Sequence, residues 1–308
     1  MDLLPETVEP VRLARDLRQS GFVAGDLATL RRRGRLEHLR RGAYATRAPV
    51  SADDAHRLLV AATVRLLGPD AVVSHTSAAL LHGLPWWAET PGCVHVTRSQ
   101  PSGGRRDPLV HVHPALLQPF DQTAIGSIAV TSLARTTADC LRALPYRRAV
   151  AVGDAALRLG LDRDDLTEQL GRAARRVGVS QARRAAAFLD ARAESVGESY
   201  SRVLIHDLRL PPPEPQVEVR DGAGRLVGRC DFGWSQFRTL GEFDGRVKYG
   251  RLLKEGQEAG DVVFDEKVRE DELRSLGNEV VRWVAADLRR PEALRARLVR
   301  AFARGGSL

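Results

Sequence analysis

The sequence predicts an α/β protein of several domains, and three observations indicate this class. The chain has 308 residues, which is enough for two domains or three small ones. Residues 8–48 have the pattern of two short helices followed by two strands, and residues 195–308 have the pattern helix, three strands, helix, strand, helix. The region between them has a mixed and mostly helical pattern. We therefore expect these segments: 1–50, 51–175, a helical linker at 176–194, and 195–308.

The composition indicates an intracellular protein with an anionic partner. The net charge of +8 and the pI near 10.1 favour nucleic acid or an acidic membrane surface, unless the whole proteome of the organism is rich in arginine. The three cysteines, Cys93, Cys140 and Cys230, are isolated, which is typical of a reducing compartment. The N-terminus lacks the apolar core of a signal peptide, and no apolar run is long enough to span a membrane. We expect a cytoplasmic protein with no membrane partner.

The first 50 residues predict a small DNA-binding unit. One helix is expected over residues 11–21 and a second over 25–34, each ended by a glycine. A strand, a turn at Arg41-Gly42 and a second strand follow, and this order is typical of a truncated winged helix. The alternative is a solvated basic face on an ordinary helical hairpin. The arginines expected to contact DNA are Arg31, Arg32, Arg33, Arg35, Arg40 and Arg41.

The middle region has one feature that suggests metal chemistry. After a helix capped by Ser51, short helices and alternating strands carry several histidines. His111 and His113 share one face of a predicted strand and could bind a metal. No carboxylate or cysteine stands at ligand spacing beside them, so structural or solvent-exposed histidines are the favoured interpretation.

The last 115 residues contain an acidic cluster on two neighbouring predicted strands. If the loop around Gln236 and Phe237 turns the chain, Asp231 faces Glu242 on one side of the sheet, about 5 Å apart at Cβ. Asp244 points to the same face, because it lies two residues further on. Opposed like charges are unfavourable unless a positive group lies between them, and a divalent cation is the simplest candidate.

The lysines are concentrated close to this cluster. Of the 47 basic residues only three are lysines, and these are Lys248, Lys254 and Lys267. A lysine can lose its proton when it is desolvated, whereas an arginine effectively cannot. The distribution therefore hints at lysine chemistry beside the carboxylates.

The C-terminal segment resembles the PD-(D/E)XK nuclease superfamily, and within it the group related to the very-short-patch repair endonuclease. The resemblance is carried by the motifs GESYSRVL, RCDF, GEFDG and FDEKVREDELRSLGNEVVRW. It implies a restriction-endonuclease-like αβββαβα domain in which Asp231 and Glu242 bind Mg²⁺ or Mn²⁺ and Glu198 assists. The position that usually carries a catalytic lysine is Asp244 here, so Lys248 or Lys267 would have to replace it.

The N-terminal half resembles the AbiEi-type antitoxin and transcriptional-regulator family of bacteria. The motifs RRGRLEHLRRGAYA, SHTSAALLHGLP and TSLARTTADCL carry this resemblance. It implies a winged helix that binds operator DNA and represses a toxin–antitoxin operon.

Three functions remain open at this point. The first is a DNA-binding protein with a Mg²⁺-dependent endonuclease domain, in which Asp231, Glu242, Glu198, Asp244 and Lys248 form the catalytic centre. The second is an AbiEi-type regulator whose nuclease-like domain is inactive. The third, an RNA-binding module, is disfavoured because aromatic residues make up only 5% of the chain. Double-stranded DNA is the expected partner of a monomer or a homodimer.

Overall fold

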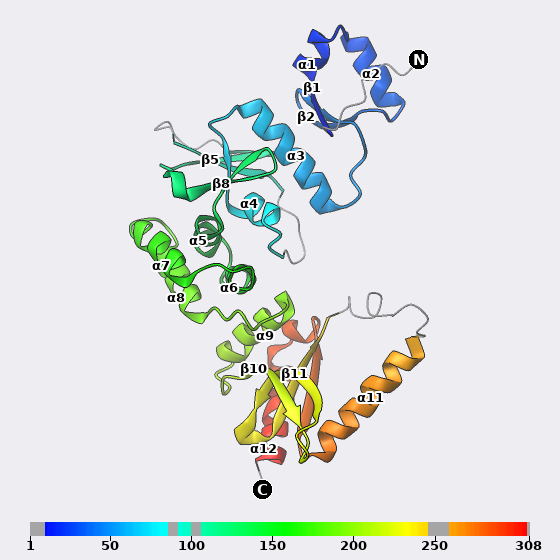
Figure 1. The fold of residues 1–308 in the computed structure, drawn as a ribbon, viewed down its shortest axis with the longest axis vertical. Coiled ribbons are helices and arrows are strands. Elements are labelled where there is room, and N and C mark those ends of the chain that lie inside the picture. Colours follow the sequence, from blue (N-terminus) through cyan, green and yellow to red (C-terminus); the bar gives the residue numbers. More distant parts are fainter. Residues whose placement is uncertain (1–9, 86–91, 100–105, 246–258, 307–308) are drawn as a thin grey trace. The chain divides into compact units, whose positions relative to one another are not determined.

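The computed structural model describes residues 10–85, 92–99, 106–245 and 259–306 (Figure 1). These ranges contain eleven α-helices and three β-sheets, so the chain is a multidomain α/β protein, as predicted. None of the helices within them is long and apolar enough to cross a membrane. The chain divides into two compact units, and each is described by itself. The first unit is Met1–Leu144 with Gly160–Ala187, and the second is Pro145–Leu159 with Phe188–Leu308.

The N-terminal part of the first unit contains a small antiparallel sheet with two helices. Its strands follow the order β1-β3-β2. The helix expected over 11–21 begins only at Ala14, because the residues before it form a strand that pairs with β3. Gly42 forms the turn between β2 and β3 with φ +84°, a backbone conformation that favours glycine. The elements are β1 (Val11–Leu13), α1 (Ala14–Gln19), α2 (Ala24–Arg32), β2 (Glu37–Arg40) and β3 (Ala43–Ala45).

The rest of the first unit is built on a six-stranded mixed sheet of order β6-β7-β5-β4-β9-β8. Residues 51–175 are mixed and mostly helical, as expected, but they contain more strands than the sequence predicts, because several strands are too short to give a clear alternating pattern. The strands are β4 (Val72–Val73), β5 (Val94–Arg98), β6 (Arg106–Asp107), β7 (Val110–Pro114), β8 (Gln122–Ile125) and β9 (Ile128–Thr131). The helices are α3 (Ala52–Leu67), α4 (His75–Leu81), α5 (Leu133–Ala143), α7 (Arg163–Arg172), α8 (Val179–Phe188) and the 3-10 turn η1 (Pro119–Asp121).

Helix α3 packs its apolar face on this sheet. Val60 of α3 is fully buried in one cluster with sheet valines such as Val73 and Val96. The helix begins where the sequence predicts, since the Ser51 hydroxyl accepts a hydrogen bond from the Asp54 amide at 3.1 Å.

The second unit has the element order α9, β10, β11, β12, α11, β13, α12, which is the order predicted for residues 195–308. Its sheet has the order β10-β11-β12-β13; the first three strands are antiparallel and β13 is parallel to β12. The helices are α6 (Tyr146–Arg158), α9 (Val196–Asp207), α11 (Ala259–Ser275) and α12 (Pro291–Gly305), and the short turns are η2 (Ser235–Phe237) and η3 (Asp287–Arg289). The strands are β10 (Glu214–Arg220), β11 (Leu226–Trp234), β12 (Thr239–Asp244) and β13 (Glu279–Val284).

Helices cover both faces of this second sheet. On one face, Leu273 of α11 packs against Leu240 and Val280. On the other face, the Trp283 indole donates a hydrogen bond to Ser201 of α9 at 2.8 Å, and Phe302 of α12 contacts the Trp234 ring. Successive residues of β12 and β13 therefore point alternately to the face covered by α11 and to the opposite face, which α9 and α12 cover.

The predicted domain boundaries differ from the compact units at α6. This helix was expected in the segment 51–175, but it packs in the second unit against α9. The buried Asp154 of α6 forms an ion pair with Arg202 of α9 at 2.8 Å. Helix α8, from the predicted linker 176–194, lies mainly in the first unit.

Candidate functional site

The hairpin between β11 and β12 has the predicted register. Phe232 pairs with Gly241, and Trp234 pairs with Thr239. The same register continued by one residue places Asp231 opposite Glu242. The paired residues Phe232 to Trp234 thus have the register that the sequence predicts, and Asp231 and Glu242 lie on the neighbouring strands β11 and β12.

The side-chain alternation of β11 breaks at Asp231. Cys230 packs with Leu240 on the α11 face, whereas Phe232 stacks on Trp283 on the other face at 5.3 Å between ring centroids. Residues two apart in a regular strand share one face, so the strand is irregular between them. The Asp231 carboxylate accepts a hydrogen bond from the Phe243 amide at 2.7 Å. It therefore lies against the β12 backbone instead of forming a regular facing pair with Glu242.

Glu242 is nearly buried, with 6% of its surface exposed, and each carboxylate oxygen has a guanidinium partner. Arg269 of α11 lies 2.8 Å from Oε1, and Arg282 of β13 lies 2.8 Å from Oε2. Arg282 is the residue that pairs with Glu242 in the parallel ladder between β12 and β13. The Cys230 thiol donates a hydrogen bond to Oε1 at 3.5 Å, and burial followed by the Glu242 charge raises the pKa of this thiol to about 12. Two arginines thus supply the positive charge that the sequence suggested for a cation.

The same arginines extend the ion-pair network to other acids. Arg282 lies 2.9 Å from Glu270 of α11 and 3.9 Å from Asp244. Glu270 also pairs with Arg274 at 2.9 Å. Asp244, which occupies the usual lysine position of the nuclease pattern, is therefore close to Arg282.

Glu198 has a structural role at the start of α9. Its carboxylate accepts hydrogen bonds from the Ser195 hydroxyl at 2.7 Å and the Glu194 amide at 2.8 Å, and the Ser195 hydroxyl accepts from the Glu198 amide at 3.2 Å. This reciprocal arrangement resembles a capping box, which stabilises a helix N-terminus. Gln216, on β10, donates a further hydrogen bond to Glu198 at 2.8 Å. Both carboxylate oxygens of Glu198 thus have partners, which are Glu194, Ser195 and Gln216.

The residues of this centre do not fit a Mg²⁺ site in the arrangement described. Mg²⁺ requires free carboxylate oxygens in near-octahedral geometry, whereas those of Glu242 are held by guanidiniums. Among the described residues, no third histidine, cysteine or acid joins Asp231 and Glu242 in a compact ligand group. Lys248 and Lys254 lie outside the described residues, and Lys267 is exposed on α11.

Sequence reasoning missed Arg269 and Arg282, which hold Glu242. A signal for Arg269 was its spacing of four residues from the apolar Leu273, which places both on one face of α11. For Arg282 the signal was the alternation Val280, Arg282 along β13. The acid that Arg282 meets depends on the pairing of β13 with β12, and the acid that Arg269 meets depends on how α11 packs on the sheet. Local sequence patterns specify neither.

The N-terminal arginines lie mostly on the surface. Five of the six predicted DNA contacts are exposed, namely Arg31, Arg32, Arg33, Arg35 and Arg41. Arg40 differs, because its guanidinium is partly buried and donates a hydrogen bond to Thr63 of α3 at 2.8 Å. This arginine connects β2 to α3.

Helix α2 has small residues on its exposed face and arginines in its last turn. Gly25 and Ala28 are exposed, whereas Leu27 and Leu30 are buried against α1 and β3 in a leucine cluster. Asp26 fixes the start of the helix, since its carboxylate accepts a hydrogen bond from the Val23 amide at 2.8 Å. Small residues allow a helix to approach a partner closely, so α2 presents a narrow face with guanidiniums at its C-terminal end.

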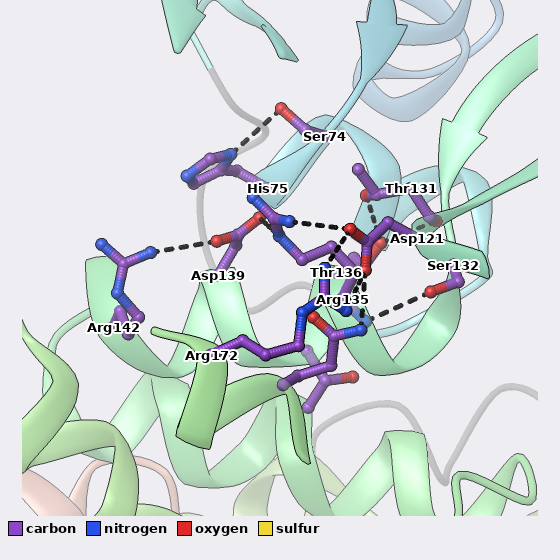
Figure 2. A network of polar contacts seen from close by, with 12 residues as sticks. Ser74, His75, Asp121, Thr131, Ser132, Arg135, Thr136, Asp139, Arg142 and Arg172 are labelled. Carbon is purple, nitrogen blue, oxygen red and sulfur yellow. Dashed lines mark hydrogen bonds and ion pairs between the residues drawn. The ribbon is translucent and has the colours of Figure 1, made fainter. Parts of the chain in front are cut away.

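A second polar centre of the first unit surrounds the fully buried Asp121, and Figure 2 shows the side chains directed at it. Arg172 donates two hydrogen bonds to its carboxylate at 2.7 and 2.9 Å, and Gln169 donates one at 2.8 Å. Arg135 lies 3.5 Å away and also pairs with Asp139 at 2.8 Å. Burial alone would raise the pKa of Asp121, but the hydrogen bonds from Arg172 and its other donors outweigh it and lower the pKa.

The fold and these sites define a multidomain α/β protein with an arginine-rich N-terminal unit and a C-terminal αβββαβα unit. No family model matches the chain. It is similar to Uncharacterized protein MT2308 of Mycobacterium tuberculosis (strain CDC 1551 / Oshkosh) and to Uncharacterized protein Rv2248 of Mycobacterium tuberculosis (strain ATCC 25618 / H37Rv). Each is 31% identical over 238 residues, which cover 76% of this chain and 82% of the relative. The chain belongs to the family of these two proteins.

Proposed function

We propose that this protein is a regulator that binds double-stranded DNA through its N-terminal helices and wing, and that its C-terminal nuclease-like unit is not catalytic. The observation that carries the proposal is the group of exposed arginines at the end of α2 and at the β2–β3 turn. The side chains of Arg31, Arg33 and Arg41 make no ion pair or hydrogen bond with the residues that the structure describes. Their charges are available for phosphates.

The order of elements supports a defined orientation on DNA. In helix-turn-helix proteins the second helix enters the major groove, while flanking groups contact the backbone. Here α2 is the second helix, and its exposed face combines Gly25 and Ala28 with terminal arginines. The turn at Arg41-Gly42 takes the place of a wing. Base readout would come from α2, and affinity from the arginines.

The ion pairs of the C-terminal unit support the absence of catalysis. A hydrolytic metal must bind to carboxylates that can give up other partners, and removing a guanidinium from a nearly buried acid is unfavourable. Glu242 would have to lose both Arg269 and Arg282. The centre therefore acts as a structural connection between β12, β13 and α11.

Binding to the promoter of the protein's own gene tests the regulatory function. The full-length protein is titrated into a fluorescent duplex of the promoter region and into a shuffled duplex of equal length and composition, at one salt concentration. The proposal expects tighter binding to the promoter by at least about 10³-fold, which is the lower end for specific DNA-binding proteins. Equal affinity for both duplexes would contradict a regulatory function.

Mg²⁺-dependent DNA cleavage is the second candidate function. It is favoured by the αβββαβα order and by the positions of Asp231 and Glu242 on adjoining strands. Supercoiled plasmid is incubated with Mg²⁺ or Mn²⁺ and with the wild-type protein or Asp231→Asn, which keeps an acceptor for the Phe243 amide. Our proposal expects no nicking by either protein. Nicking by the wild type that is abolished by Asp231→Asn and by chelation would establish the endonuclease instead.

A further inference from the structure

Several histidines share one face of the six-stranded sheet of the first unit. His95 of β5 and His111 of β7 are directly paired in the parallel ladder, and His113 lies two residues further along β7. Val94 and Val96 alternate with His95 and pack in the valine core on the opposite face. The strand pattern therefore brings imidazoles together from segments that are separate in the sequence.

A histidine from a third segment completes the group. His75 is the first residue of α4, and only 7% of its surface is exposed. Its ring stacks on His113 with 3.7 Å between the centroids. One nitrogen from each of His75, His95 and His113 lies within 4.8 Å of the others. The sequence pointed to His111 and His113 as a pair, whereas the structure groups His113 with His75 and His95.

The hydrogen bonds of these rings orient their nitrogens. His95 Nδ1 and His113 Nε2 face each other at 2.9 Å. His75 Nδ1 lies 3.0 Å from the Ser74 hydroxyl (Figure 2), so Nε2 is the nitrogen of His75 that remains for a further partner. Cys93, which the sequence spacing did not connect to this group, has its sulfur 3.5 Å from His95 Nε2. A ring nitrogen held by a neighbouring group is typical of histidines that bind metals.

The surroundings also favour neutral rings. Burial, followed by the neighbouring His95 and Arg142, holds the pKa of His75 well below its usual value. Burial and the neighbouring histidines lower the pKa of His113 to about 2. A neutral imidazole keeps the lone pair that a metal ion needs. His75 also has φ +51°, an uncommon conformation for a residue other than glycine, and such outliers concentrate at ligand sites.

We propose that His75, His95 and His113 bind one divalent transition metal ion, for which Zn²⁺ is the best match. Imidazole suits Zn²⁺, and Zn–N distances of about 2.0–2.1 Å in tetrahedral geometry separate the nitrogens by about 3.3 Å. The contact of 2.9 Å between His95 Nδ1 and His113 Nε2 is close to this spacing, and the stacked ring of His75 would have to turn out of its parallel arrangement with His113 to bind the same ion. Water takes the fourth position. The ion joins α4, β5 and β7, so it stabilises the first unit.

Metal titration of the full-length protein tests this site. The protein is freed of metal with a chelator and then titrated with Co²⁺, whose visible absorption reports tetrahedral coordination, and the Co²⁺ is displaced with Zn²⁺. The variants are His95→Gln and His113→Gln. The matched control is His206→Gln, which removes an exposed histidine of the second unit. Circular dichroism checks that each variant is folded.

The expected result is one equivalent of Co²⁺ with tetrahedral absorption, and a higher melting temperature in the presence of Zn²⁺. His95→Gln and His113→Gln should each weaken binding by at least about 100-fold, whereas His206→Gln should bind like the wild type. The proposal is overturned if the wild-type protein takes up no equivalent of either metal. It is also overturned if both folded ligand variants retain wild-type affinity. If the variants do not fold, the titration and melting of the wild type decide the outcome.

Discussion

At the scale of single residues, Glu242 is the acid of the C-terminal unit whose two ion pairs, with Arg269 and Arg282, carry the proposal that this unit is not catalytic. The sequence identifies it as one of two acids that require a positive partner, and the structure supplies Arg269 and Arg282. A nearly buried charge with two guanidinium partners contributes to stability mainly because its loss removes an acidic partner from two partly buried arginines. The same residue would be essential for catalysis in an active nuclease. The structural role of Glu242 is therefore tested by protein stability, and a catalytic role would be tested by DNA cleavage.

Glu242→Gln should lower the free energy of unfolding by about 1–3 kcal/mol, because Arg269 and Arg282 would lose a charged partner in a mostly buried position. Urea denaturation of the full-length protein measures this change. The control is Glu218→Gln, which removes an exposed ion pair with Arg220 and should cost less than about 1 kcal/mol. Equal effects of the two substitutions would contradict the structural role of Glu242.

Asp121→Asn should destabilise the first unit by about 3 kcal/mol at neutral pH, since it leaves Arg172 and Arg135 beside an uncharged amide. The pKa of Asp121 is lowered in the folded protein, so its stabilising contribution is present above the unfolded-state pKa of about 3.9 and is lost as the pH falls below it. Unfolding at several pH values should therefore show a cost that shrinks on acidification. Asp70→Asn, at an exposed position, is the control and should show no such dependence. A cost for Asp121→Asn that is independent of pH would contradict this assignment.

At the scale of elements, α9 is seated on β12 through a position that only glycine can occupy. A Cβ added to Gly197 would lie 1.9 Å from the Phe243 ring. Phe243 also donates its amide hydrogen to Asp231, so a displaced ring would disturb the carboxylate centre. The start of α9 and the end of β12 are therefore coupled by contact.

Gly197→Ala should lower the stability by about 1–3 kcal/mol or more, as overpacking of a core does. Thermal unfolding measures the effect. Gly222→Ala is the matched control, because no atom lies within 4 Å of its added Cβ and its φ is not in the left-handed region. An unchanged melting temperature for Gly197→Ala would show that α9 does not pack on Phe243 as described.

The sequence was informative about elements whose ends carry local signals. Ser51, Gly42 and the proline at the start of α12 mark boundaries where the structure has them. The order of elements in the second unit could be predicted, because its helical segments and its strand segments each have a clear hydrophobic period. Only some strands of the six-stranded sheet could be expected, because β4, with two residues, has no detectable period. The packing of α6 on α9 could not be predicted, because it depends on contacts distant in sequence.

For the candidate site, the sequence likewise predicted local features, but it did not predict which side chains are partners. The turn at η2 gave the predicted register of β11 and β12 from Phe232 to Trp234. The irregularity of β11 at Asp231 and the partners of Glu242 arise from tertiary packing. The histidine group likewise required the parallel pairing of β5 with β7, which brings His95 beside His113. Local patterns therefore indicated which side chains carry chemistry but not which of them meet.

At the scale of the whole molecule, part of the positive charge is concentrated near the N-terminus. The chain carries a net charge of +8, and between residues 31 and 41 there are six arginines and one acid. Basic proteins bind DNA in part by releasing counterions from phosphates, so the affinity falls as salt rises. If arginine were only in general excess, substitutions anywhere on the surface would change the salt dependence of DNA binding equally. In a protein with a DNA-binding unit, only a few arginines determine this salt dependence.

The most direct test of the account is the salt dependence of duplex DNA binding by the wild type, by Arg31→Ala/Arg33→Ala, and by Arg295→Ala/Arg300→Ala. All four arginines are exposed and each double substitution removes two positive charges, but Arg295 and Arg300 lie on α12. Only the substitution of Arg31 and Arg33 should lower the affinity, by about ten- to a hundredfold at moderate salt, and reduce the slope of log K against log salt by about 1.8. Equal slopes for all three proteins, or equal losses for both pairs, would contradict DNA binding through the N-terminal helices and wing.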